Sequence, residues 1–341
     1  MALWQGVGYH EPIALPDNET LELLAAGHIL GSAMVRLSRS GKHLVFTGDL
    51  GGGNSPLLPP TEKVSDATYL VMEGTYGDRV RPDDAQRRDR LENIIEDTVA
   101  RGGTLLIPPF STERTQDLIY EIRTLMVERR VPSMPVFIDS PLASKITAAF
   151  VANPEYFAPE MRKRIEGGEH LFAFDEAKFI ENTQASLDIH KIEGPKIILA
   201  GSGMSSGGRI FSHEREYLPD ERSTILIVGY QAAGTIGRKL VEGAKSLELY
   251  APAAPHGRKA GHGGMERVPV RARVETLYGY SAHRDSESLL QFANDTADTA
   301  KEIFVVHAEP ASAAFLSQRI RDYLGVKATV PAKGDKVTLQ L

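Results

Sequence analysis

Short apolar runs alternate with segments of helical charge spacing through the middle of the chain, and this alternation is the feature that most limits the possible folds. Each run is continuous and short, which is typical of a strand buried on both faces. Strands separated by helices indicate a parallel sheet covered by helices on both sides. We therefore predict a doubly wound α/β domain. The expected strands are 103–108, 135–139, 196–200 and 223–228, and the expected helices are 84–101, 113–129 and 143–152.

The two ends of the chain have a different pattern. In the first part, strand-like runs follow one another with turns between them, and in the last part each strand-like run is followed by a helix. A Gly/Pro-rich stretch at 251–265 is expected to be a hairpin tip or a linker. The pattern thus changes near residue 79 and again near residue 266. The expected outer strands are 21–25, 33–37, 43–47, 67–72, 274–280 and 303–306, and the helices are 285–294 and 311–324.

Length and composition narrow the class of protein. At 341 residues the chain exceeds what one hydrophobic core usually serves, which predicts two domains. It has no cysteine, so His, Asp and Glu remain as its metal ligands. A formal net charge of -6 argues against a largely basic surface that would bind nucleic acid non-specifically, but it does not exclude a local basic groove. No apolar run reaches the roughly 20 residues of a membrane helix, and the N-terminus lacks a secretory pattern, so we expect a cytoplasmic location.

Polar residues stand where several apolar runs stop. They are His28, Asp49, Glu73, His283 and His307. Imidazole nitrogen and carboxylate oxygen are zinc ligands, and loops held by rigid strands are common places for them. Taken one at a time, a strand-end histidine is more often a hydrogen-bonded structural residue, and a Gly-Asp pair is usually only a turn. The other histidines are interpreted as structural or exposed.

Three loops follow strands of the predicted parallel sheet. They are Phe110-Ser111-Thr112-Glu113-Arg114, the glycine-rich stretch 200–209 and Gly229-Tyr230-Gln231. Glycines let a backbone approach a ligand closely, and N–H groups at a helix start can hold a phosphate. Since all three loops should lie at the carboxyl edge of the sheet, they predict a phosphate-facing edge. Glycine-rich turns also exist merely to turn the chain.

Read together, five stretches resemble the β-CASP family, the metallo-β-lactamase-fold RNA nucleases related to the mRNA 3′-end processing factor and ribonuclease J. The stretches are Gly27-His28-Ile29-Leu30-Gly31-Ser32-Ala33, Thr47-Gly48-Asp49-Leu50-Gly51, Glu73-Gly74-Thr75-Tyr76-Gly77-Asp78-Arg79, Ser281-Ala282-His283 and Val305-Val306-His307-Ala308-Glu309. They occur in the family's order over nearly the whole chain. The resemblance implies a partial metallo-β-lactamase αββα sandwich formed by residues 1–78 and 266–341, with a doubly wound β-CASP domain inserted at 79–265.

The resemblance also implies a zinc-dependent ribonuclease that acts on single-stranded RNA. By family likeness, His28 and His307 would be zinc ligands, Asp49 would bridge two zinc ions, and Glu73 would pair with His283. His283 would help to protonate the leaving oxygen, which suits a histidine held by a carboxylate. The residues expected to hold flanking phosphates are Arg114, Ser202, Ser205 and Arg209.

One departure from the family pattern concerns the metal site. The family's His-x-His-x-Asp-His run, which supplies four metal ligands, does not occur in these 341 residues. Two zinc ions belong to the complete family site, whereas His28, Asp49 and His307 alone predict one ion or none. We therefore expect a fragment, a misplaced start codon or a split gene, completed by a homodimer or by a partner that supplies the missing segment.

Three hypotheses about function follow. The first is a ribonuclease of RNA processing or decay, and the second is a catalytically incomplete fragment or subunit that keeps RNA-binding or partner-binding surfaces. The third is a small-molecule hydrolase of the wider metallo-β-lactamase superfamily. The β-CASP insert implies a nucleic-acid substrate and argues against the third.

Overall fold

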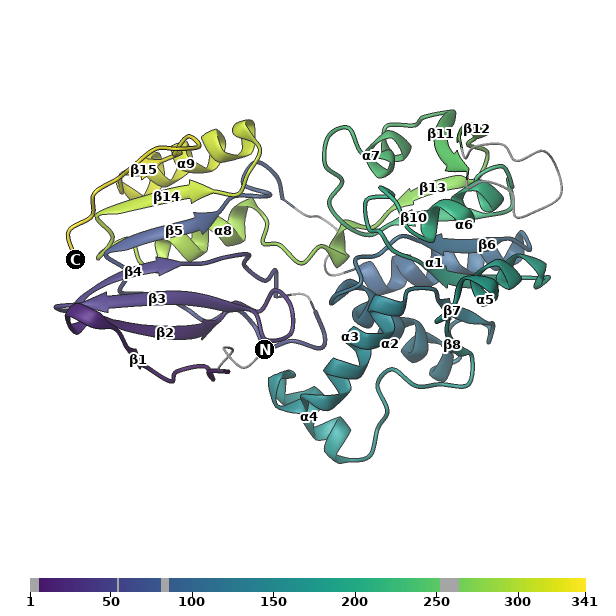
Figure 1. Ribbon diagram of the computed structural model, residues 1–341, viewed down its shortest axis with the longest axis horizontal. Helices are drawn as coiled ribbons and strands as arrows, with labels where there is room; N and C mark the ends of the chain where they lie inside the picture. Colours follow the sequence, from purple (N-terminus) through teal and green to yellow (C-terminus); the bar gives the residue numbers. More distant parts are fainter. Residues whose placement is uncertain (1–5, 54, 81–85, 252–263) are drawn as a thin grey trace. The chain divides into compact units, whose positions relative to one another are not determined.

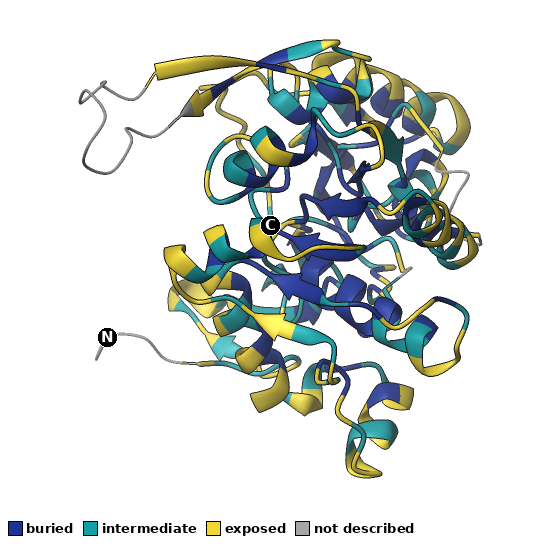
Figure 2. Cartoon of the chain, turned by 90° about the vertical axis from the view of Figure 1, so that its right-hand side faces the viewer, coloured by how far each residue is buried: buried dark blue, intermediate teal, exposed yellow. Residues whose placement is uncertain are grey.

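The computed structural model describes residues 6–53, 55–80, 86–251 and 264–341, and the chain divides into two compact units (Figure 1). Unit 1 consists of Met1–Arg81, Glu155–Met161 and Ala282–Leu341. Unit 2 consists of Pro82–Pro154 and Arg162–Ser281. In both units the central strands of the sheet are the most deeply buried part (Figure 2).

Unit 2 has a six-stranded parallel sheet in the order β13-β10-β6-β9-β7-β8. Leu106 shares a core with Ile210 and Tyr217 on one face of this sheet, while Leu105 and Ile107 are buried on the opposite face. The prediction of a doubly wound domain is therefore confirmed. The strands are β6 Thr104–Ile107, β7 Val136–Ile138, β8 Ala177–Phe179, β9 Lys196–Leu199, β10 Thr224–Ile227 and β13 Arg273–Thr276.

The first three helices of unit 2 lie close to the three predicted ones, and the other four have no counterpart in the sequence prediction. The helices are α1 Arg87–Ala100, α2 Arg114–Val127, α3 Pro141–Ala152, α4 Pro159–Glu166 (which begins in unit 1), α5 Thr183–Asp188, α6 Ile210–Tyr217 and α7 Ile236–Val241. Strands β11 Ser246–Ala251 and β12 Gly264–Pro269 pair as an antiparallel hairpin. Between them, residues 252–263 of the predicted loop at 251–265 lie outside the described residues. No helix of the described chain is long and apolar enough to cross a membrane.

Unit 1 has a seven-stranded mixed sheet in the order β1-β2-β3-β4-β5-β14-β15. Helices α8 Ser286–Asn294 and α9 Pro310–Leu324 cover one face, where Leu289 and Leu316 share a core with Leu70 and Met72 of β5. The strands are β1 Ile13–Ala14, β2 Thr20–Ala25, β3 Ala33–Arg39, β4 Lys42–Phe46, β5 Tyr69–Glu73, β14 Glu302–Val306 and β15 Ala328–Thr329. Strands β4, β5 and β14 are parallel to one another, so their carboxyl ends meet at one edge.

The other face of the unit 1 sheet also carries apolar side chains. One row is partly covered, because Leu339 and Leu341 pack against Leu44 and Tyr69. The adjacent row pairs Leu23 with Val35, Val35 with Phe46, and Phe46 with Val71, and Phe46 is 40% exposed. Strands apolar on both faces are typical of a sheet that lies between two layers.

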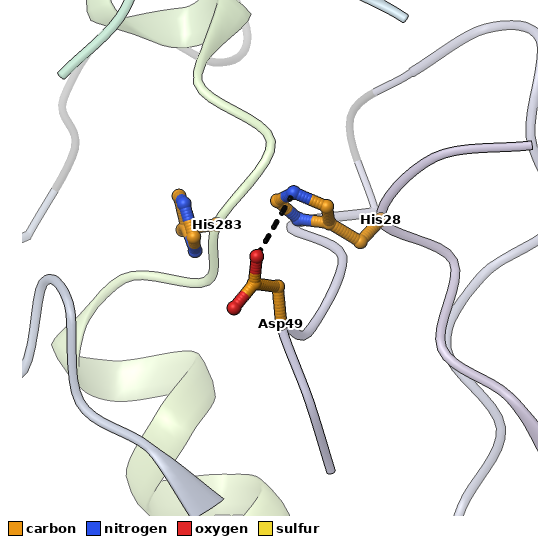
Figure 3. Close-up of side chains that lie close together, drawn as sticks. All are labelled: His28, Asp49 and His283. Carbon is orange, nitrogen blue, oxygen red and sulfur yellow. Dashed lines mark ion pairs between the residues drawn. The ribbon is translucent and has the colours of Figure 1, made fainter. Parts of the chain in front are cut away.

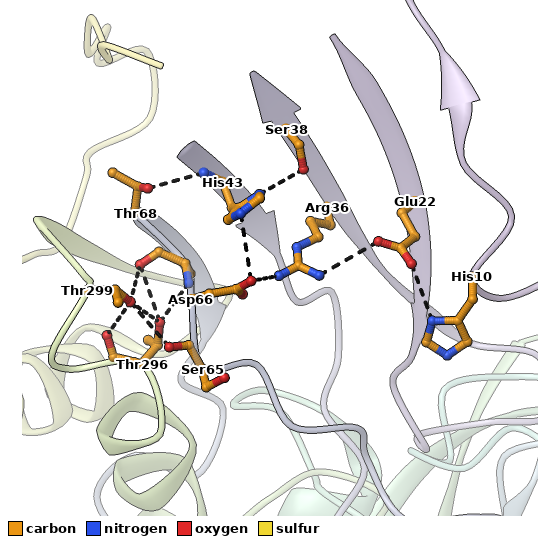
Figure 4. A network of polar contacts seen from close by, with 11 residues as sticks. His10, Glu22, Arg36, Ser38, His43, Ser65, Asp66, Thr68, Thr296 and Thr299 are labelled. Atoms are coloured by element: carbon orange, nitrogen blue, oxygen red, sulfur yellow. Dashed lines mark hydrogen bonds and ion pairs between the residues drawn. The ribbon is translucent and has the colours of Figure 1, made fainter. Parts of the chain in front are cut away.

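A line of polar contacts crosses β2, β3 and β4 (Figure 4). Arg36 pairs with Asp66 and lies 3.7 Å from the Glu22 carboxylate, and His43 contacts Ser38 at 2.8 Å. The register places Glu22 opposite Arg36, on the same face as Val45. The helix-covered face of the sheet thus carries charged side chains on β2 and β3. Because these side chains pair with each other, part of the free-energy cost of removing them from water is offset.

The return of the chain to unit 1 comes later than the predicted boundary at residue 266. Strand β13 pairs in parallel with β10, so residues 266–281 belong to unit 2. The expected strand at 274–280 ends at Thr276, and Tyr278–Tyr280 is a 3-10 turn. Residues 155–161 belong to unit 1, where Ala158 N donates to Leu57 O. A short apolar run has the same pattern in either sheet, so the sequence alone could not assign it.

Candidate active site

Five candidate residues lie at one edge of the unit 1 sheet. Asp49, Glu73 and His307 stand at or just beyond the carboxyl ends of β4, β5 and β14. Open α/β sheets bind ligands at such an edge. His28 follows β2, and His283 precedes α8. His28, Asp49 and His283 gather around one point (Figure 3).

Asp49 lies between two imidazoles. Its Oδ2 is 3.7 Å from His28 Nε2, and its Oδ1 is 3.6 Å from His307 Nε2. One donor atom each of His28, Asp49 and His283 lies within 4.8 Å of the others. His307 is 65% exposed and has a left-handed φ of 50°, which a non-glycine residue adopts only under local constraint. The structure thus brings the three predicted ligands together and places His283 beside them.

Glu73 positions the imidazole of His283 through a hydrogen bond. Its buried carboxylate lies 2.9 Å from His283 Nδ1, and Oε1 accepts a 2.6 Å hydrogen bond from Leu50 N. Burial raises the pKa of Glu73, but the hydrogen bond and charge of His283, together with the Leu50 N–H, outweigh it, so the net pKa lies below its usual range. An ionised Glu73 accepts from Nδ1 and fixes the ring, which leaves Nε2 for the site.

Gly51 joins the segments that carry these residues. Its N–H donates to Ala26 O at 2.9 Å, and it forms a β-bridge with His283. Its carbonyl accepts from Arg284 Nε at 3.0 Å. A Cβ on residue 51 would lie 1.9 Å from Gly27 O, so only glycine allows this approach. The Asp49 loop is therefore packed directly against the turn that bears His28.

The donor set fits zinc. Two imidazoles and one carboxylate, those of His28, His307 and Asp49, are ligand types that zinc accepts, and a catalytic zinc site with three protein ligands keeps one position open. The Asp49 side chain is 42% exposed, so the centre is accessible from solvent. Glu73, hydrogen-bonded to Nδ1, fixes the tautomer and orientation of the His283 imidazole. His28, Asp49 and His307 are the residues that could hold the ion, and His283 lies beside them.

The two arginines predicted to bind RNA phosphates have other partners. Arg209 donates to Asp139 Oδ1 at 2.6 Å and to the carbonyls of Ile180 and Glu181. Arg114 is 4% exposed and pairs with buried Asp117. A phosphate needs guanidinium donors that are open to solvent, so this geometry argues against direct phosphate contact by either arginine. Arg209 instead holds the segments that follow β7 and β8, and Arg114 pairs within the first turn of α2.

The two predicted serines differ from each other. Ser202 lies at the surface of the glycine-rich loop, where its Oγ accepts a hydrogen bond from Ser206 N at 2.9 Å. Ser205 is fully buried with a φ of 50°. Ser202 therefore stays a candidate for phosphate contact, whereas the buried Ser205 hydroxyl is closed off from solvent.

A buried polar cluster beneath these loops escaped the sequence interpretation. Asp139, at the end of β7, accepts from His213 Nε2 at 2.7 Å and from Ser186, and His213 Nδ1 lies 3.0 Å from His190 Nε2. Burial raises the pKa of Asp139, but its bonds to His213 and Ser186 lower it further than burial raises it. Burial and the charge of His213 lower the pKa of His190 to about 4. Arg209 completes this cluster, which fixes the loop edge.

Glu214 on α6 should make stability depend on pH. It is fully buried, and burial raises its pKa to about 7 while the Ser205 hydroxyl offsets only part of that rise. Because the folded pKa exceeds the unfolded value of 4.5, the carboxyl costs stability as pH rises from 4.5 to about 7. Glu214→Gln should therefore raise the free energy of unfolding at pH 8 by up to ~3 kcal/mol relative to the parent chain. The gain should vanish near pH 4.5 in urea unfolding.

The exposed Glu216, two residues along the same helix, provides the control for that measurement. Glu216→Gln should change stability by less than about 0.5 kcal/mol at either pH. A gain for Glu214→Gln that is equal at both pH values would contradict the raised pKa.

Two family models match the chain. A Beta-Casp domain model matches residues 115–240, and the model of a Zn-dependent metallo-hydrolase RNA specificity domain matches residues 267–331. Ribonuclease TTHA0252 of Thermus thermophilus is 34% identical over 285 residues, which cover 83% of this chain and 61% of that protein. The RNase J-like protein of Methanocaldococcus jannaschii is 28% identical over 331 residues, which cover 96% of this chain and 73% of that protein.

The transcription termination factor FttA of Methanocaldococcus jannaschii is 30% identical over 326 residues, which cover 94% of this chain and 50% of that factor. The chain thus spans between half and three quarters of these relatives. A crystal structure of a protein of unknown function from Enterococcus faecalis V583 has a TM-score of 0.51 at 10% identity, covering 98% of this chain and 67% of that one. This last likeness concerns the fold alone.

Proposed function

Because the chain belongs to the β-CASP family of metallo-β-lactamase-fold nucleases, we propose that it is a zinc-dependent ribonuclease that hydrolyses phosphodiester bonds of single-stranded RNA. The observation that carries this proposal is the cluster of His28, Asp49 and His283, with His307 3.6 Å from Asp49 and with Glu73 hydrogen-bonded to His283. Imidazole and carboxylate donors of this kind suit metal-assisted hydrolysis.

We assign separate roles in this proposed reaction to individual residues of the chain. Zinc held by His28, Asp49 and His307 would supply a Lewis acid for the scissile phosphate. Asp49 and His28 would hold the ion in position. Both residues follow the end of a strand, and the rigid strands keep their side chains in place. His283, fixed through Nδ1 by Glu73, can hold a proton on Nε2 for the leaving oxygen. Ser202 and the glycine-rich loop of unit 2 are proposed to contact flanking phosphates.

We further propose that this chain alone holds one ion and that a partner segment or a second copy completes a two-ion site. Three ligand residues, His28, Asp49 and His307, lie together here, and two zinc ions with about four ligands each need more. The apolar row formed by Leu23, Val35, Phe46 and Val71 supports a further layer over the outer sheet face. The same segment could supply both the layer and the missing ligands.

A cleavage assay on end-labelled single-stranded RNA tests the proposed activity. The purified chain should bind about one zinc ion and cleave RNA only when zinc is present. Intact RNA at full zinc occupancy, with RNA binding retained, would instead support a catalytically incomplete subunit. Cleavage that persists in a chelator would contradict the zinc requirement.

A further inference from the structure

Phe110 is an exposed aromatic residue held between two glycine loops of unit 2. It follows β6 and is 39% exposed. A Cβ on Gly203 would lie 2.9 Å from ring atoms Cγ and Cδ2, and one on Gly229 would lie 3.4 Å from Cε2. The loops after β9 and β10 therefore lie against the ring, and the glycine at 203 makes this closeness possible.

The backbone of Phe110 is also fixed. Its carbonyl accepts hydrogen bonds from the backbone N–H of Thr115, at 3.3 Å, and from Thr115 Oγ1, at 2.7 Å. An aromatic ring anchored in this way loses little conformational freedom when a ligand contacts it. Phe110 thus offers a preformed flat apolar surface.

Small polar groups lie on the same and neighbouring loops. Ser111 and Ser140, which follow β6 and β7, have hydroxyl oxygens 3.4 Å apart, and Ser202 and Ser206 contact each other on the glycine-rich loop. Hydroxyls and loop N–H groups suit phosphate oxygens, whereas the ring suits a flat apolar partner. A nucleotide combines both chemistries in one unit.

We propose that Phe110 is a stacking platform for a base of single-stranded RNA, with the neighbouring phosphate held by the serine-bearing loops. This inference rests on the proposed RNA substrate. Stacking on an aromatic side chain accepts any base, so the platform gives affinity and alignment without sequence preference.

Equilibrium binding of a labelled RNA oligonucleotide, measured with EDTA so that no cleavage occurs, tests the platform. Phe110→Leu should weaken binding about tenfold, and Phe110→Tyr should bind like the parent. Phe179 on β8 is 37% exposed, so Phe179→Leu provides a matched control that should change nothing. An oligonucleotide with abasic sugars in place of every nucleotide should bind Phe110→Leu and the parent equally.

The outcomes separate this inference from the proposed function. Normal RNA affinity in Phe110→Leu overturns the platform and leaves the ribonuclease proposal intact. An equal loss on abasic and normal RNA also overturns it, because the effect would then come from the loop and not from a base. A parent chain that neither binds nor cleaves RNA overturns both.

Discussion

Asp49→Ala should remove zinc from the chain and lower RNA cleavage at least about a thousandfold, which corresponds to ~4 kcal/mol of transition-state stabilisation. The Asp49 carboxylate lies 3.7 Å from His28 Nε2 and 3.6 Å from His307 Nε2, so it is the donor between the two imidazoles. Its loss leaves neutral ligands at a divalent ion. The number of zinc ions per chain can be measured by elemental analysis after dialysis. The rate of RNA cleavage can then be measured on the same sample.

Asp188 provides a matched control for this experiment. Its side chain is 47% exposed, against 42% for Asp49, and it contacts Lys191 at the surface of unit 2. Asp188→Ala should keep the zinc content and the cleavage rate of the parent. A chain with Asp49→Ala that retains full zinc and full cleavage would exclude Asp49 from the metal centre.

The sequence predicts the elements around the site well because each ends in an abrupt change of polarity. Strands β4, β5 and β14 are continuous apolar runs, and Asp49, Glu73 and His307 stand where those runs stop. Which of these residues meet in space depends on strand order, and the sequence alone does not state it. The resemblance to a family supplied that order. Their roles as ligands and proton donor stay predictions.

The phosphate-binding assignments show where sequence patterns lose information. An arginine after a strand has the same appearance whether its guanidinium faces solvent or a buried carboxylate, and Arg209 faces Asp139. Likewise, Glu214 and His213 lie among polar residues on α6, and both are fully buried. Burial of such residues depends on tertiary contacts with distant strands. The spacing of residues along the sequence does not predict these contacts.

The missed elements are short. Strand β8 has three residues and α5 has six, and neither length allows a period to be recognised. Strand β8 is defined by pairing with β7, and α5 begins where the Asn182 side chain accepts from Ala185 N. These segments take their structure from neighbours and caps more than from their own hydrophobic pattern.

Gly51→Ala should destabilise unit 1 by about 3 kcal/mol or more and reduce zinc binding with it. The added Cβ would lie 1.9 Å from Gly27 O and 2.3 Å from Gly27 C, and both are backbone atoms that no rotamer change can move. The backbone must therefore shift on both sides, which separates His28 from Asp49 and breaks the bridge to His283. Thermal unfolding and zinc titration measure the two effects.

Gly31, on the turn that bears His28, separates steric crowding from loss of glycine flexibility. Its φ is 76°, but a Cβ there would meet nothing within 4 Å, so Gly31→Ala should cost only about 1–2 kcal/mol and leave zinc affinity nearly unchanged. Hydrogen exchange of the β2 and β4 amides should locate the damage from Gly51→Ala in unit 1, with unit 2 still protected. Equal effects of the two substitutions would mean that backbone conformation, and not close packing of the Asp49 loop on the His28 turn, sets the geometry of the site.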